Sequence, residues 1–105
     1  MCVAGLLVVI AAIAGHLGEA RGSVPGGTTV FDDQVAGVAN LDPALKAALR
    51  RAATDARRDG ITLYVDSGWR SPKYQEQLLR EAIAKYGSEQ QALRWVATPS
   101  TSSHV

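Results

Sequence analysis

The chain has 105 residues, a net charge of +1 and one cysteine, Cys2. This length allows one small domain at most. The balanced charge contains no block of one sign, which argues against nucleic acid as a partner. A single cysteine excludes an intrachain disulfide framework and a cysteine-based metal site.

The first element is an uncharged apolar run over residues 3–14. Its length is typical of the apolar part of a signal peptide and is short for a membrane-spanning helix, although no basic residues precede it. A core helix is the alternative. A Gly-, Ser- and Thr-rich stretch follows, as in a linker. We therefore expect a leader helix over 1–20, which is a signal peptide or a membrane anchor, then a linker over 21–38 and one domain over 39–105.

This division predicts an exported protein, located in the cell envelope or outside the cell. Association with a membrane through residues 3–17 stays open, as does cleavage of the leader. Because the leader also contains His16, one of the two histidines of the chain, that side chain is not expected to join a soluble site.

The first helix of the domain is predicted to begin after Asp42 and to end at Gly60. Asp42 is a favourable N-cap, Pro43 suits the first turn, and glycine commonly ends a helix. Apolar residues recur at helical spacing and predict one buried face: Leu45, Ala48, Leu49, Ala52 and Ala56.

Residues 61–66 are predicted to form a strand, because Ile61, Leu63 and Val65 alternate with more polar positions. A single strand cannot satisfy its own backbone groups. The expected sheet must therefore be completed by strands outside these residues.

A second helix is predicted from Ser71, as N-cap, to Gly87, with Tyr74, Leu78, Ala82 and Tyr86 as its apolar stripe. A third helix is predicted to begin at Ser88, which forms a capping box with Gln91, and to run toward Pro99. We expect Leu93 and Val96 to be buried in it, with Trp95 as a further candidate.

Arg70 stands directly before the helix that begins at Ser71, where the helix macrodipole is positive. A carboxylate, a phosphate or a developing oxyanion would satisfy both the dipole and the guanidinium group. The alternatives are an exposed arginine and an ion pair with Asp66. Gln75, in the first turns of the same helix, can donate and accept toward a polar ligand, although a surface glutamine is the ordinary case.

His104 lies in a loop, two residues after Ser102. Neutral imidazole is the commonest metal ligand, but zinc catalysis needs about three protein ligands. On spacing alone, His104 is better explained as a lone solvent-facing histidine near the end of the chain.

The two elements together carry a resemblance. Gly68-Trp69-Arg70-Ser71 with Gln75, followed by Ser102-Ser103-His104, resembles the zinc D-Ala-D-Ala carboxypeptidases of the VanY type, the M15 peptidase family, over residues 39–105. That family has a Gly-aromatic-Arg-Ser element with a glutamine shortly after it. A later Ser-x-His-x-x-Gly-x-Ala-x-Asp element supplies a histidine and an aspartate that bind zinc.

The resemblance implies an α+β fold in which helices pack on an antiparallel sheet. This chain would hold the N-terminal portion of that domain. The sheet, the aspartate ligand, the second histidine ligand and the catalytic glutamate would lie mostly or wholly after residue 105.

The resemblance also implies roles. His104 would bind Zn²⁺, and Arg70 would hold either the substrate carboxylate or the oxyanion of the tetrahedral intermediate. Gln75 and Ser102 would orient the D-Ala end of the peptide. The expected function is removal of terminal D-Ala from peptidoglycan stem peptides by a zinc-dependent D,D-carboxypeptidase, here as a truncated, inactive and monomeric chain.

Two other functions remain open. The chain is alternatively a non-catalytic exported module that binds peptidoglycan and retains the Arg70 pocket. A membrane-tethered helical fragment without any ligand is the third possibility.

Overall fold

The computed structural model describes residue 18 and residues 20–105, and this part of the chain is helical and contains no strand. Its helices are α2 (Ala36–Ala39), α3 (Pro43–Arg58), α4 (Pro72–Tyr86) and α5 (Glu89–Ala92). Nearly all of the leader predicted over 1–20 lies outside the described residues, including Cys2 and His16. Among the helices that are described, none combines the length and the apolar character needed to cross a bilayer.

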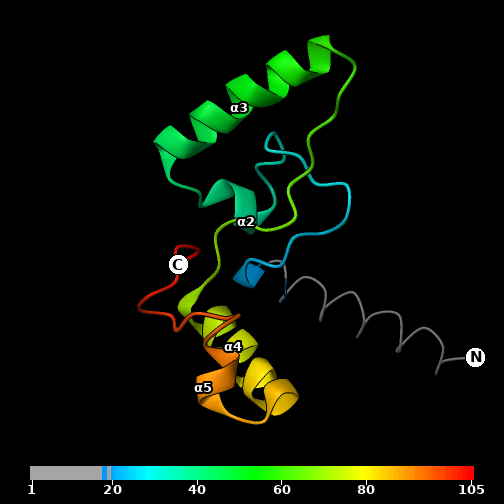
Figure 1. Ribbon diagram of the computed structural model, residues 1–105. Helices are drawn as coiled ribbons and strands as arrows, with labels where there is room; N and C mark the ends of the chain where they lie inside the picture. Colours follow the sequence, from blue (N-terminus) through cyan, green and yellow to red (C-terminus); the bar gives the residue numbers. More distant parts are fainter. Residues whose placement is uncertain (1–17, 19) are drawn as a thin grey trace, which may run out of the picture.

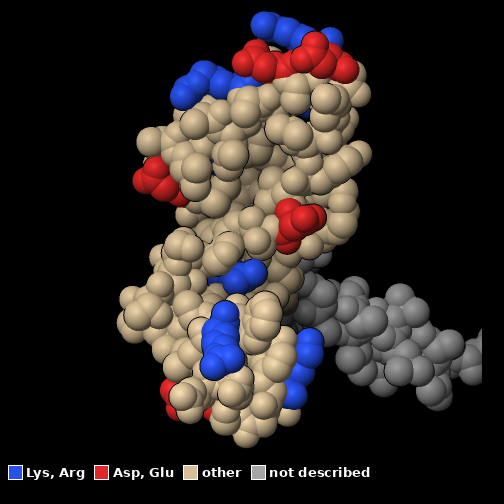
Figure 2. All heavy atoms as spheres, viewed as in Figure 1, with Lys and Arg blue, Asp and Glu red and all other residues tan. Residues whose placement is uncertain are grey.

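Helix α3 lies at one end of the molecule and the pair α4 and α5 at the other (Figure 1). The segment after α3 runs from one end to the other, and α2 lies between them. Charged side chains of both signs gather over the end formed by α3, whereas most of the middle is uncharged (Figure 2). Over the opposite end, formed by α4 and α5, the same view shows mainly Lys and Arg side chains (Figure 2).

Helix α3 begins and ends as predicted. The Asp42 side chain accepts a hydrogen bond from the Leu45 N–H at 3.0 Å, and the helix ends at Arg58, just before Gly60. Its predicted apolar face, however, is wrong: Leu45 and Leu49 are 49% and 38% exposed, and Ala53 is the buried residue of the helix. Within the described residues, Arg50 and Lys46 attach α3 to the segment before it through hydrogen bonds and ion pairs.

The strand predicted over 61–66 is not formed. The segment is extended, but in the described part of the chain only two of its N–H groups donate to backbone carbonyls: Ile61 to Ala56 at 3.0 Å and Val65 to Thr28 at 2.8 Å. Ile61 and Leu63 remain 55% and 44% exposed. A strand needs a continuous ladder, and no neighbouring segment supplies one here. The α+β expectation is thus not confirmed by the described residues.

Helix α4 has the predicted bounds. The Ser71 hydroxyl accepts from the Tyr74 N–H at 3.1 Å. At the other end, Gly87 adopts the left-handed conformation, with φ of 86°, and its N–H donates to the Ile83 carbonyl. Glycine adopts this conformation at little cost, which explains the helix stop.

Helix α5 starts as predicted and ends earlier. The Ser88 hydroxyl accepts from the Gln91 N–H at 3.2 Å, but the helix ends at Ala92 and turns follow. The small core between α4 and α5 consists of Leu79, Ala82 and Ala92, with Ile83 and Val96 packed against it. Of the predicted stripe of α4, Ala82 is buried, Tyr74 and Leu78 are half-buried, and Tyr86 is exposed.

The predicted burial of Leu93 and Trp95 is wrong, since they are 44% and 71% exposed. The early end of α5 changes the direction of the chain after Ala92, so these side chains no longer follow the buried face of the helix. Val96 is half-buried and does join the core, as predicted.

Helix α2 was not predicted, because a helix of four residues carries no periodic pattern. The chain that leads into α4 is held by α2 and by the segment near Arg21. The Trp69 N–H donates to the Gly37 carbonyl at 2.8 Å, and the Ser71 N–H donates to the Arg21 carbonyl at 2.8 Å. Gly68 passes so close to Gly37 that a Cβ atom on Gly68 would collide with the Gly37 carbonyl oxygen.

Candidate functional site

Arg70 and His104, which are far apart in the sequence, lie together in the structure. The Arg70 N–H donates to the His104 carbonyl at 2.7 Å. In return, His104 Nδ1 lies 2.8 Å from the Gly68 carbonyl oxygen. The C-terminal loop is thus bound to the segment that opens α4, and both side chains are half-buried there.

The contact with Gly68 determines how His104 presents its ring. A carbonyl oxygen only accepts hydrogen bonds, so Nδ1 must carry the proton in this contact. In the neutral ring, Nε2 then has a free lone pair. Metal-binding histidines are commonly oriented in this way, by donation of the other ring N–H to a backbone carbonyl. His104 therefore has the form required of a single metal ligand.

Gln75 is the most deeply buried side chain of the site, with 2% of its surface exposed. Its Nε2 donates to the Ala97 carbonyl at 2.9 Å, and its Oε1 accepts from Arg70 Nη1 at 3.3 Å. The amide thus links α4 to the chain that leads to His104 and also orients the guanidinium group. No buried side-chain polar atom among the described residues lacks a partner.

Ser102 stabilises the loop before His104. Its hydroxyl oxygen accepts from the His104 N–H at 3.1 Å, and its own N–H donates to the Thr98 carbonyl at 2.9 Å. The Ser102 O–H itself can still donate, so this residue retains the ability to bind a ligand.

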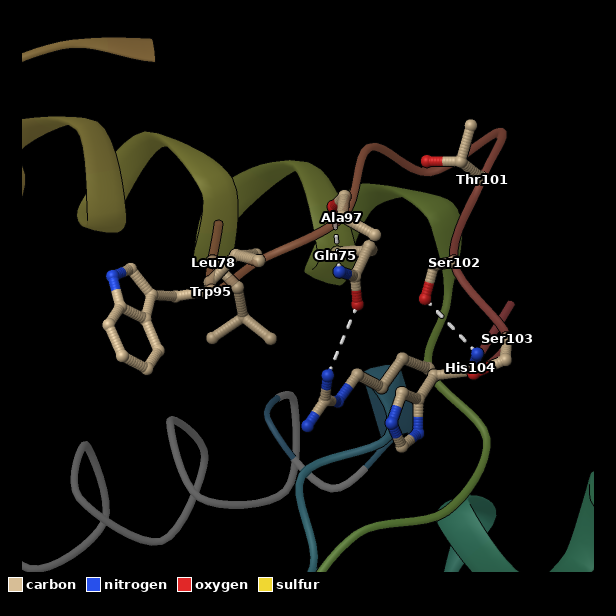
Figure 3. Close-up of a pocket in the computed structure, with 10 residues that line it drawn as sticks. Gln75, Leu78, Trp95, Ala97, Thr101, Ser102, Ser103 and His104 are labelled. Carbon is tan, nitrogen blue, oxygen red and sulfur yellow. Dashed lines mark hydrogen bonds between the residues drawn. The ribbon is translucent and has the colours of Figure 1, made fainter. Parts of the chain in front are cut away.

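One cavity of about 520 Å³ joins all four residues predicted from the sequence. Figure 3 shows Gln75 between Trp95 at one end and His104 at the other, with Ser102 near His104. The cavity is lined by Arg70, Gln75, Leu78, Trp95, Val96, Ala97, Thr101, Ser102, Ser103 and His104. Sequence reasoning missed Trp95 as a site residue, because its spacing suggested the buried face of a helix.

Arg70 does not form the ion pair with Asp66 that was one alternative. The ion pairs found among the described residues join other side chains, on α3 and on the exposed surface of α4. Arg70 contacts a neutral amide instead, beside the N-terminal end of α4. A helix N-terminus and a guanidinium group both favour an anion at this position.

A complete zinc site is not present in the part of the chain that the structure describes. No three His, Cys, Asp or Glu side chains lie close enough together there to hold a metal ion. His104 fits one position of a zinc site, but the described residues do not fit the whole site.

This geometry suits a polar, anionic ligand, because a guanidinium group, a helix N-terminus and a histidine-bearing loop border one cavity. Comparison with protein families identifies the class of protein. The family model for D-alanyl-D-alanine carboxypeptidase, VanY, matches residues 38–105, and the chain belongs to this family. The match confirms the resemblance and its extent. No curated protein and no solved structure matches the chain.

From membership of this family we expect a peptidoglycan-derived substrate and a location in the cell envelope. The family match spans Arg70, Gln75, Ser102 and His104 but does not test what each of them does. Their roles are therefore taken up as proposals.

Proposed function

We propose that the cavity between Arg70 and His104 binds the D-Ala-D-Ala end of peptidoglycan stem peptides, as part of a zinc-dependent D,D-carboxypeptidase. The observation that supports this most directly is that one cavity joins the four residues of the family's two sequence elements. The described residues supply the groups that are needed to recognise the end of the peptide.

Arg70 is proposed to bind the terminal carboxylate of the peptide. Its guanidinium group can donate two parallel hydrogen bonds to a carboxylate, and the bond to Gln75 uses only one of its donors. The oxyanion of a tetrahedral intermediate is the other anion that would satisfy this position. A binding experiment with uncleaved peptide isolates the first of these roles.

Gln75 and Ser102 are proposed to contribute in different ways. Both polar atoms of Gln75 are engaged within the protein, so it orients the D-Ala end of the peptide through Arg70. Ser102, with a free O–H, donates directly to a peptide carbonyl of the substrate.

His104 is proposed as a zinc ligand through Nε2. Zinc in such a site would polarise the scissile carbonyl and activate a water molecule. Because the described residues do not fit a complete zinc site, we propose that they carry peptide recognition and that these residues alone do not hydrolyse the peptide. Export through the apolar segment 1–20 would bring the site to its cell-wall substrate.

The test is a calorimetric titration with Nα-acetyl-Gly-D-Ala-D-Ala and with the same peptide amidated at its C-terminus. We expect the free acid to bind, and Arg70→Ala to weaken its binding by about tenfold to a hundredfold, since a hydrogen bond to a charged group contributes about 1.5–3 kcal/mol. The amide should bind weakly to either protein.

Arg80→Ala is the matched control, because Arg80 lies on α4, pairs with Glu76 on the surface and does not line the cavity. Equal affinity for the acid and the amide, or full affinity in Arg70→Ala, would refute recognition of the carboxylate.

A further inference from the structure

A second cavity, of about 160 Å³, lies next to the Arg70 cavity and shares two lining residues with it, Ser103 and His104. In Figure 1 the C-terminal loop lies between α4 and the chain that leads into α3. His104 therefore borders both cavities, whereas Arg70 lines only the first. The remaining lining of the second cavity comes mostly from the chain around the start of α3: Asn40, Leu41, Asp42, Leu45, Trp69 and Val105.

The proposed function implies the direction in which a peptide passes from one cavity to the other. With the terminal carboxylate at Arg70, the bond to be cleaved lies one residue further along, at the position of His104. The peptide thus runs toward His104 and away from Trp95, which Figure 3 shows on the other side of Gln75. Two residues of extended chain span about 7 Å, so the third residue from the end passes His104, where the second cavity opens.

We infer that the second cavity binds the side chain of the residue that precedes the D-Ala pair, and that Asp42 makes it prefer a basic side chain. This inference rests on the proposed function, because it takes Arg70 as the carboxylate site. Among the lining residues, Leu41, Leu45 and Trp69 offer apolar surface to a chain of methylene groups. The Asp42 carboxylate attracts an ammonium group at the end of that chain.

Asp42 is the one acidic side chain that lines the second cavity. Its Oδ2 accepts a hydrogen bond from the Leu45 N–H at 3.0 Å, as the N-cap of α3. None of the ion pairs among the described residues includes Asp42. Lys46, one turn further along, instead donates to the Ala39 carbonyl at 3.3 Å and lies 3.6 Å from the Asp33 carboxylate. The charge of Asp42 is thus left for a cation of the ligand.

The test uses three peptides of the form Nα-acetyl-X-D-Ala-D-Ala, where X is glycine, norleucine or lysine. Norleucine carries the methylene chain of lysine without its ammonium group. Affinity is measured by calorimetry on the 105-residue chain at low ionic strength. We expect norleucine to bind about three- to tenfold more tightly than glycine, since a butyl chain is partly buried. Lysine should bind about two- to fivefold more tightly than norleucine, which is the size expected of an exposed ion pair.

Asp42→Asn removes the charge and keeps the cap of α3, because asparagine is as good an N-cap as aspartate. It should abolish the preference for lysine over norleucine and retain the preference for norleucine over glycine. In the wild type, the preference for lysine should shrink in about 0.5 M salt, which screens exposed charges. Asp66→Asn is the matched control: Asp66 is an exposed aspartate that lines neither cavity, so this variant should prefer lysine as the wild type does.

The two tryptophans report which way the peptide runs. Trp69 lines the second cavity, and Trp95 lines only the first. Their indole N–H resonances are assigned with Trp95→Phe. The Trp69 resonance should shift further with the norleucine and lysine peptides than with the glycine peptide, whereas the Trp95 resonance should respond alike to all three.

A preference for lysine that is absent in the wild type, or that persists in Asp42→Asn, would overturn the inference. So would shifts that depend on the side chain at Trp95 and not at Trp69, because the peptide would then run in the opposite direction. Neither result depends on the carboxylate test. Equal binding of acid and amide forms would instead refute the proposed function, whatever the side-chain series shows.

Discussion

Gln75 illustrates at the scale of one residue how the site is held together. On the sequence it is a glutamine in the first turns of a helix, where exposure is the ordinary case. In the structure it is 2% exposed and bonded at both ends of its amide. Its partner Ala97 lies 22 residues away in the chain, and no local pattern predicts such a partner.

The first prediction concerns this amide. Gln75→Met preserves the length of the side chain but leaves the Ala97 carbonyl and Arg70 without their partner. We expect a loss of about 1–3 kcal/mol in the free energy of unfolding, the usual cost of an unsatisfied buried group, together with weaker peptide binding. Chemical denaturation and calorimetry would measure the two effects.

The variant Gln75→Glu distinguishes between two roles of the Gln75 side chain, which are orientation of Arg70 and packing. A carboxylate at this position would compete with the peptide carboxylate for Arg70, so peptide affinity should fall more than in Gln75→Met. Gln77→Met, on the same helix, removes an exposed bond to Glu81 and serves as the control. If the glutamate variant binds peptide as the wild type does, Gln75 does not act through Arg70.

The second prediction concerns Gly68. Two backbone segments approach so closely at this position that there is no room for a Cβ atom. Gly68→Ala would force its Cβ against the Gly37 carbonyl and displace the segment that accepts the His104 bond. Overpacking of this kind costs about 1–3 kcal/mol. Thermal unfolding should show the loss, and the His104 ring resonances should shift. Gly26→Ala is the control, since a Cβ there has nothing within 4 Å; equal behaviour of the two variants would contradict the close approach.

At the scale of elements, α3 is attached to the rest of the chain through charged groups. Arg50 donates from Nη2 to the Asp33 carboxylate at 2.6 Å and from Nε to the Val30 carbonyl at 3.2 Å. Lys46 lies 3.6 Å from the same carboxylate. The hydrogen bond from Arg50 lowers the pKa of Asp33 below its ordinary value of 3.8. Desolvation opposes this shift, and the positive charges of Arg50 and Lys46 reinforce it.

The third prediction follows from the sign of that shift. Because the pKa of Asp33 is lower in the folded state, its ionised form stabilises the fold at all pH values above 3.8. This stabilisation is lost as the pH falls through the lowered pKa of the folded state. Asp33→Asn should therefore reduce the urea midpoint at pH 6, and the difference from wild type should shrink as the pH is lowered beyond the ordinary aspartate pKa of about 4.

Asp55→Asn controls for a general effect of removing a negative charge near α3. Asp55 pairs with Arg58 on the exposed surface of the helix, where both side chains are more than 70% exposed. Such a pair contributes little. A difference between Asp33→Asn and wild type that is the same at every pH would show that the Arg50 contact does not depend on ionisation of Asp33.

The elements also show which parts of the fold could be predicted from the sequence. The N-caps Asp42, Ser71 and Ser88 were predicted correctly, because capping depends on residues within one turn. The strand over 61–66 and the end of α5 were not, because each depends on a partner segment. Alternation shows that a segment suits a sheet, but it does not show that a neighbouring strand is present.

Prediction of the site had the same limit. Arg70 suggested an anion site from its place before a helix, whereas its proximity to His104 came from the family resemblance. Their contact depends on two bonds, from the Arg70 N–H to the His104 carbonyl and from His104 Nδ1 to the Gly68 carbonyl, which no spacing rule provides. Trp95 is a candidate core residue on the sequence, because the pattern gives no indication that α5 ends at Ala92.

At the scale of the whole molecule, several large apolar side chains remain exposed on α3 and on the extended segment after it, in addition to those near α5. Leu49, Leu63 and Tyr64 line a shared groove of about 210 Å³ together with buried or half-buried neighbours. The proposed peptide cavity is lined by a separate set of residues, from Arg70 onward. Substitutions in this groove should therefore change stability or solubility without changing peptide specificity.

The last prediction concerns the whole chain and zinc. In the described residues no three potential ligands lie together, and His104 offers one nitrogen. A single imidazole would leave the other positions of a tetrahedral zinc ion to water, so we expect weak zinc binding and no release of D-Ala from D-Ala-D-Ala peptides. Calorimetric zinc titration of the wild type and of His104→Ala, with a D-Ala release assay, measures both. Sub-micromolar zinc binding by a monomer that is lost in His104→Ala would mean that further ligands of the chain converge on His104, and measurable D-Ala release would show that the chain is catalytically complete.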